Sequence, residues 1–266
     1  MTAQLTGLRI LVPRGGDAAV RAEDAIRTRG GVPVRVPLIA TVPPVDPAAF
    51  DAAIAAWNAG EYEWLAVTSA AGAAAVAAAG ASPGRIAAVG PATVAALAAG
   101  GLAATVRPVS EFTGTALGAA LAAELGTASD TVPDQPTRIL LALAEGAGTE
   151  LERALQDAGH LVTRVTAYRT VPAPRDPARE RTVATGHVDV ILVTSGSVAR
   201  EVAVRFLPLP AGVRLVAIGP PTARVLAELG LTPDLVAERH TVPGMLDALA
   251  AAHPHSFPPH HTGESA

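Results

Sequence analysis

The chain has 266 residues, enough for one large domain or two modest ones that each bury a core. It contains no cysteine and no lysine, which excludes disulfides, thiolate ligands and nucleophiles, and catalysis through a lysine Schiff base. The formal charge of −4 gives no basic excess for nucleic acid, and no apolar run approaches the length of a membrane span.

Short apolar runs alternate with helical patterns from the beginning of the chain. Residues 9–12 predict a buried strand, and residues 17–29 predict a helix that Gly30-Gly31 ends. Further strands are expected at 32–36, 64–67, 86–89, 138–143, 188–193 and 213–218, each followed by a helix-compatible stretch. The alternation predicts an α/β protein with parallel sheets flanked by helices.

The chain repeats itself at an offset of about 129 residues. Residues 8–11 recur as 137–140, and residues 89–93 recur as 218–222, whereas Thr68-Ser69 matches Thr194-Ser195 at an offset of 126. A duplication on this scale implies two similar halves, and a cleft between two halves is a natural binding site.

Proline-rich stretches occupy equivalent places in the two copies, at 37–47 and 171–177, where we expect extended chain without helix. The seam between the copies lies at 126–136. Cutting at the seam gives tandem domains, whereas cutting at the two proline-rich crossings gives one continuous domain and one built from both chain ends. Residues 253–266 have no hydrophobic periodicity; their four histidines could bind a metal, but we interpret the segment as a disordered tail.

Small and hydroxyl-bearing residues follow the predicted strands in both copies. Because ligands of parallel sheets bind where the strands end, we take these residues as candidates for contacts to an anionic ligand. They are Thr68, Ser69, Gly90, Thr93, Thr194, Ser195, Gly196, Ser197, Gly219 and Thr222. The alternative is plain helix capping, for which Ser and Thr need no ligand.

Two further residues are candidates, each with an ordinary alternative. Arg14 follows the first strand, where it could pair with a carboxylate or remain a solvated surface charge. Tyr168 lies at the second crossing, where its phenol could face the space between domains and donate a proton, or could simply brace the linker. His160, His187 and His240 have no ligand spacing, and we expect surface or loop positions for them.

Taken in order, these motifs resemble those of the uroporphyrinogen-III synthase family over residues 8–251. The anchors are an Arg after the first strand, the two Thr-Ser pairs, Val89-Gly90 with Thr93, Tyr168, and Ile218-Gly219-Pro220 with Thr222. The resemblance implies an enzyme that closes hydroxymethylbilane, a linear tetrapyrrole, into a macrocycle with loss of water and inversion of the last ring.

The resemblance also implies roles and architecture. Tyr168 would assist departure of the hydroxyl through an azafulvene cation and a spiro intermediate, without metal or organic cofactor, and the small polar residues with Arg14 would contact substrate. Residues 1–38 and 171–252 would form one domain and residues 41–167 the other, joined by a two-stranded linker with a cleft between them. We expect a monomer, with no nucleic-acid or membrane partner. The absence of a visible secretory signal favours the cytoplasm.

The chain departs from the family pattern at Pro13, Glu145 and Pro221, and Glu145 puts an acid where a polyanionic substrate would lie. An alternative function is a non-catalytic, synthase-like sensor of a ligand, disfavoured by the retained Tyr168 and by the lack of a DNA-binding region after residue 252. A solute-binding protein is a third reading, disfavoured by the missing signal peptide and scarce aromatics.

Overall fold

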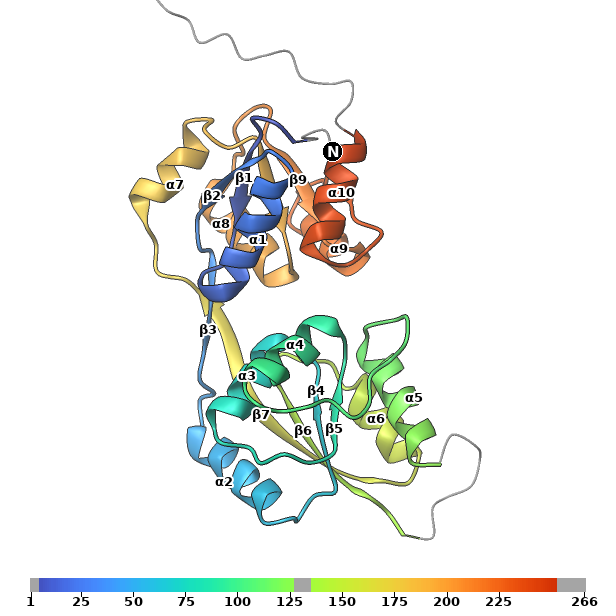
Figure 1. Cartoon of the computed structure of the whole chain (residues 1–266). Helices are drawn as coiled ribbons and strands as arrows, with labels where there is room; N and C mark the ends of the chain where they lie inside the picture. Colours follow the sequence, from blue (N-terminus) through green and yellow to red (C-terminus); the bar gives the residue numbers. More distant parts are fainter. Residues whose placement is uncertain (1–4, 127–134, 253–266) are drawn as a thin grey trace, which may run out of the picture. The chain divides into compact units, whose positions relative to one another are not determined.

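A computed structural model describes residues 5–126 and 135–252, which form two compact units. Unit 1 comprises residues 1–40 and 171–266, and unit 2 comprises residues 41–170. The chain therefore crosses between the units twice, within strands β3 (Ile39–Val42) and β7 (Leu161–Pro172), which are neighbours in one sheet. Figure 1 shows these two crossings and the elements of each unit. The tail expected at 253–266 lies outside the described residues.

Unit 1 is built around a sheet whose described strands run in the order β10-β9-β8-β1-β2, and every registered pair in it is parallel. The strands are β1 (Arg9–Val12), β2 (Val32–Arg35), β8 (Val190–Val193), β9 (Arg214–Ala217) and β10 (Leu235–Val236). The helices are α1 (Gly16–Thr28), α7 (Pro177–Ala184), α8 (Gly196–Phe206), α9 (Pro220–Glu228) and α10 (Val242–Ala252).

In unit 2 the described strands run in the order β3-β7-β6-β4-β5, and the pairs β7-β6, β6-β4 and β4-β5 are parallel. Its remaining strands are β4 (Trp64–Val67), β5 (Ile86–Ala88) and β6 (Arg138–Ala144). Its helices are α2 (Pro47–Asn58), α3 (Ala70–Ala78), α4 (Pro91–Ala99), α5 (Gly114–Glu124) and α6 (Glu150–Asp157).

The central strands are apolar throughout because both faces of each sheet are covered. All four residues of β4 and of β8 are buried. Their side chains alternate between two core clusters: Ile191 packs with α7, α8 and α9, whereas Leu192 packs with α1 and α10. This is the doubly covered parallel sheet that the continuous apolar runs predict, so the α/β fold class is confirmed.

Each unit draws its sheet from both copies of the repeat. Strands β1 and β2 from the first copy pair with β8 and β9 from the second, whereas β4 and β5 from the first pair with β6 and β7 from the second. The two orders, β9-β8-β1-β2 and β5-β4-β6-β7, match strand for strand. Equivalent loops of the repeat therefore occupy equivalent edges of two different sheets.

The proline-rich stretches hold more regular structure than their composition suggests. Each contains strand residues, and its last proline begins a helix, Pro47 in α2 and Pro177 in α7. The expectation of helix-free chain was wrong at those ends because proline suits the first helical turn, where its missing N–H is no loss. Asp46 and Asp176 cap these helices through their side chains.

No helix among the described residues is long and apolar enough to cross a membrane.

Candidate functional site in two strand-end loop sets

In unit 2, the loop after β4 begins with Thr68 and Ser69, both partly exposed. Ser69 is the N-cap of α3, and its Oγ accepts a hydrogen bond of 2.9 Å from the backbone N–H of Gly72. The capping role considered for this residue is therefore real. The cap uses one lone pair of the Ser69 oxygen. The second lone pair and the hydroxyl hydrogen remain for other partners.

Tyr168 uses the second lone pair of Ser69. Its hydroxyl donates to Ser69 Oγ at 3.0 Å, and its ring packs partly buried against the core on the α3 side. With both acceptor positions occupied, Ser69 has only its own hydrogen left to donate to a ligand. The two candidate residues therefore form one hydrogen-bonded pair.

An irregularity in the sheet sets the position of Tyr168. Strands β6 and β7 pair in register up to Leu143 opposite Thr166, and the next pair is Ala144 opposite Tyr168. Ala167 is thus the extra residue of a bulge, a device that re-aims the side chain that follows. The backbone N–H of Glu145, at 2.9 Å, donates to the carbonyl of Tyr168, which fixes the end of β6 beside it.

Packing around Gly72 is tight beneath the pair. A Cβ atom at this glycine would lie 3.2 Å from Ser69 Oγ and 3.3 Å from the carbonyl oxygen of Ala142. A side chain here would require Ser69 or the Ala142 carbonyl to shift by a few tenths of an ångström, so glycine lets the first turn of α3 lie close to β6 and to Tyr168.

The loop after β5 contributes Gly90 and Thr93. Gly90 is the N-cap of α4 and has no side-chain cap, while Thr93 is buried with its N–H bonded to the Gly90 carbonyl at 3.0 Å. Phe112 packs over Gly90, since a Cβ there would lie 3.0 Å from its ring.

In unit 1, the loop after β8 carries Thr194, Ser195, Gly196 and Ser197, all partly exposed. Ser195 caps α8 as Ser69 caps α3, accepting from the N–H of Val198 at 3.3 Å. Thr194 differs from these caps because its Oγ1 atom is buried yet has no hydrogen-bond partner within the described residues. Buried hydroxyls are normally satisfied, so this one stands out among the candidates.

The loop after β9 repeats the arrangement of Gly90 in the other unit. Gly219 begins α9, the buried Thr222 bonds back to its carbonyl at 3.1 Å, and His240 packs over the glycine. A Cβ at Gly219 would lie 2.7 Å from the imidazole. Pro220 and Pro221 carry no N–H, so this helix start offers a ligand fewer backbone donors than the sequence pattern suggested.

The sheet order brings the candidates of each unit to one edge. In unit 1 the loops after β9, β8 and β1 are consecutive, and the last of them holds the half-buried Arg14. In unit 2 the loops after β5 and β4 lie next to the end of β6, where Glu145 is exposed. Among the candidates, Ser69 and Tyr168 are joined by a side-chain hydrogen bond.

His240 and Phe112 are the neighbours that the sequence pattern did not reveal. Each directly precedes a threonine that caps the next helix, Thr241 for α10 and Thr113 for α5. Their shared position, directly before a capping threonine, is the sequence signal that could have identified them. The other histidines stand apart from both loop sets: His187 is exposed, and His160 lies in a loop but is 4% exposed.

Two other features do not coincide with the candidates. Among the described residues no three His, Asp or Glu side chains gather as a metal site. A cavity of about 530 Å³ in unit 1 is lined by α7, the end of α8 and residues 207–210, and none of the predicted site residues lines it.

Comparison with known proteins gives a consistent match. The family model described as uroporphyrinogen-III synthase HemD matches residues 20–247. A mutant uroporphyrinogen III synthase from Thermus thermophilus is similar in structure, with 20% identity, a TM-score of 0.55, and coverage of 92% of this chain and 98% of that one. The uroporphyrinogen-III synthetase of Helicobacter pylori has 13% identity, a TM-score of 0.58, and coverage of 93% and 99%. No curated protein sequence matches the chain.

Proposed function

Because the chain belongs to the uroporphyrinogen-III synthase family, we propose that it converts hydroxymethylbilane to uroporphyrinogen III, closing the macrocycle with loss of water and inversion of ring D. The family match over residues 20–247 carries this proposal. The pairing of Tyr168 with Ser69 supports it, since the tyrosine that the resemblance singled out is held at a strand-end loop.

The first chemical step is departure of the hydroxyl group. The bond between the terminal methylene carbon and the hydroxyl oxygen breaks, the electrons of the pyrrole stabilise the cation as an azafulvene, and the oxygen leaves as water after taking a proton. In the free protein the hydroxyls of Tyr168 and Ser69 are hydrogen-bonded to each other, and Ser69 has one hydrogen to donate. We assign the two residues as a relay in which Ser69 donates to the leaving hydroxyl while Tyr168 supplies the proton to Ser69, and the Tyr168 phenolate regains a proton when the carbon that closes the macrocycle loses its own.

The second task is to hold the ends of the chain for the inverted closure through a spiro intermediate. Positioning of this kind lowers the barrier by fixing geometry rather than by adding a reactive group. We propose that Thr68, Gly90 and Thr93 in unit 2 contribute substrate contacts. The residues proposed for unit 1 are Arg14, Thr194, Ser195, Gly196, Ser197, Gly219 and Thr222.

The substrate is a small molecule with many carboxylates, and its recognition requires donors. Helix starts of α3 and α8 supply backbone N–H groups without an intrahelical acceptor, together with the positive end of the helix dipole. Thr194 supplies a buried hydroxyl without a partner in the described chain. No metal or organic cofactor is needed in this scheme, and we propose that the protein acts as a monomer.

Incubation of the purified protein with freshly made hydroxymethylbilane tests the proposal directly. We expect the type III isomer to dominate the cyclised product. Formation of the type I isomer alone, at the rate seen without protein, would show that the chain is not a synthase.

A further inference from the structure

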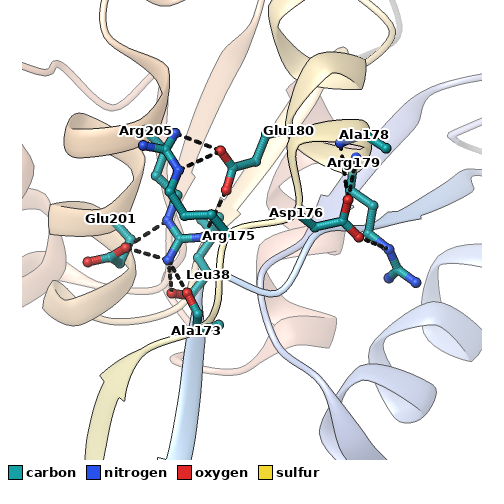
Figure 2. A network of polar contacts seen from close by, with 9 residues as sticks. All are labelled: Leu38, Ala173, Arg175, Asp176, Ala178, Arg179, Glu180, Glu201 and Arg205. Carbon is teal, nitrogen blue, oxygen red and sulfur yellow. Dashed lines mark hydrogen bonds and ion pairs between the residues drawn. The ribbon is translucent and has the colours of Figure 1, made fainter.

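The two segments that connect unit 1 to unit 2 are bound at their unit 1 ends by a single side chain. Leu38 lies just before β3, and Ala173 lies just after β7; the N–H of Ala173 donates to the Leu38 carbonyl at 2.9 Å. Nη2 of Arg205, in α8, donates to both backbone carbonyls, at 3.1 Å to Leu38 and 2.6 Å to Ala173. One guanidinium group thus holds both crossings (Figure 2).

The remaining donors of Arg205 are also used. Nη1 donates to Glu180 at 3.0 Å and Nε donates to Glu201 at 2.7 Å, while Arg175 binds the other oxygen of Glu180 at 2.6 Å. The Arg205 side chain is only 2% exposed, and the side chains of Glu180 and Glu201 are 9% and 13% exposed. Figure 2 shows the guanidinium between the two carboxylates and the two carbonyls.

Stability alone does not account for this arrangement. Well-packed apolar side chains hold two helices together at least as well as a buried ion pair, because burying charges costs solvation energy. What an apolar residue lacks is the planar fork of donors that can bind two carboxylates and two carbonyls at once. The network is therefore specific for fixing the backbone at Leu38 and Ala173.

Burial falls off shortly beyond these two residues, after Ile39, which at 4% exposed still packs in the unit 1 core. Leu38 and Ala173 are buried, whereas Thr41, Thr170 and Pro172 are exposed. Backbone with few buried contacts opens at low free-energy cost, so the connection is most easily bent on the unit 2 side of the anchor. Two compact units joined in this way are expected to move relative to one another.

We propose that Arg205 is the anchor of the connection: it fixes where both segments leave unit 1, so that bending is confined to residues 40–42 and 169–172. It is then a positioning residue for the reaction, because the paths of both segments determine which arrangements of the two loop sets are reached. This catalytic consequence rests on the proposed function, whereas the anchoring itself does not.

The structural test uses Arg205→Lys, which keeps a charge near Glu180 and Glu201 but cannot bind both carbonyls, and Arg205→Met as a second variant. Arg175→Gln is the matched control, since it removes an exposed partner of Glu180 without touching either carbonyl. Because the chain contains no cysteine, Val20→Cys in unit 1 and Val109→Cys in unit 2 give one spin label per unit. The two valines are 46% and 95% exposed.

We expect Arg205→Lys to broaden the distribution of label-to-label distances and Arg175→Gln to leave it unchanged. Hydrogen exchange at the Ala173 amide should become about 10- to 100-fold faster, the factor that corresponds to losing a charge-assisted hydrogen bond. Exchange of the β8 amides reports whether unit 1 stays folded. With hydroxymethylbilane, the lysine variant should release a larger share of the type I isomer than wild type or the control.

Three results would overturn the proposal. One is an unchanged distance distribution and unchanged Ala173 exchange in a folded Arg205→Lys protein. Another is equal broadening in Arg175→Gln, which would trace the effect to Glu180 rather than to the carbonyls. The third is loss of protection from hydrogen exchange throughout β8, which would show that Arg205 stabilises unit 1 as a whole. A wild-type protein that gives only type I product would contradict the proposed function and leave the distance and exchange results standing.

Discussion

The hydroxyl of Tyr168 donates a hydrogen bond of 3.0 Å to Ser69 Oγ, between residues 99 positions apart in the sequence. The serine is already an acceptor for the Gly72 N–H, which leaves it one lone pair and one hydrogen to share between Tyr168 and a ligand. Four predictions follow from this pair and from two other polar groups of the described chain.

Tyr168→Phe should lower kcat by about 100-fold or more, because it removes the proton source for the leaving hydroxyl. The ring remains, so packing in unit 2 and KM should change little. Steady-state kinetics with hydroxymethylbilane measures both constants. Tyr62→Phe is the control, since Tyr62 is the other tyrosine of the chain and also packs against the core on the α3 side. Equal activity in the two variants would remove Tyr168 from the mechanism.

The two capping serines offer a matched comparison. Ser69→Ala and Ser195→Ala should each cost about 1 kcal/mol of unfolding free energy, since each removes one N-cap hydrogen bond. Only Ser69→Ala breaks the contact with Tyr168, so only this variant should lose kcat, whereas Ser195→Ala should act on KM. Urea unfolding and kinetics separate the effects. A large loss of kcat in Ser195→Ala would argue against the relay.

Thr194→Val should stabilise the free protein and weaken substrate binding. Valine has nearly the shape of threonine and removes a buried hydroxyl that has no partner among the described residues, a change worth up to about 1 kcal/mol in stability. The same hydroxyl is proposed to bind substrate, so KM should rise about 5- to 10-fold with kcat retained. A variant that is destabilised would indicate that the hydroxyl is already satisfied in the free protein.

Unit 2 should become less stable as the pH falls below about 6.5. Burial lowers the pKa of the His160 imidazole below its ordinary value of 6.5, so the unfolded chain takes up the proton more readily than the folded one. Stability from this group is therefore complete above pH 6.5 and is lost as the pH falls toward the folded-state pKa. The slope from one group is at most about 1.4 kcal/mol per pH unit.

Denaturant unfolding at pH 7.5 and pH 5.5 measures the effect. His160→Gln should flatten the dependence, while the exposed His187→Gln should leave it as in wild type. An unchanged slope in His160→Gln would assign the acid sensitivity to other groups.

The strands were predictable because their signal is local. Residues 9–12 and 64–67 form strands β1 and β4 with the expected limits, since uninterrupted apolar runs are needed where both faces of a sheet are covered. The placement of Ser69 and Ser195 at helix starts was equally local, because a serine after a strand is a natural cap.

The contact between Tyr168 and Ser69 was not predictable from the sequence. It depends on the bulge after Leu143, which shifts the register of β7 by one residue, and no residue of that strand marks the shift. The packing of His240 on Gly219 depends likewise on how the loop after β10 returns over the sheet edge. The role of Arg205 also went unnoticed, because an arginine in a helix gives no sign of being buried against two distant carbonyls.

The exchange of strands between the two copies bears on how such a chain could have arisen. A protein made of the first copy alone would hold β1 to β5, which belong to two different sheets and cannot complete either. Two such proteins could complete both by trading halves, as a domain-swapped dimer does. Fusion of the two genes would turn that dimer into a single chain, and afterwards each half would be free to change alone. The two copies differ in this way where Phe112 packs over Gly90 and His240 packs over the equivalent Gly219.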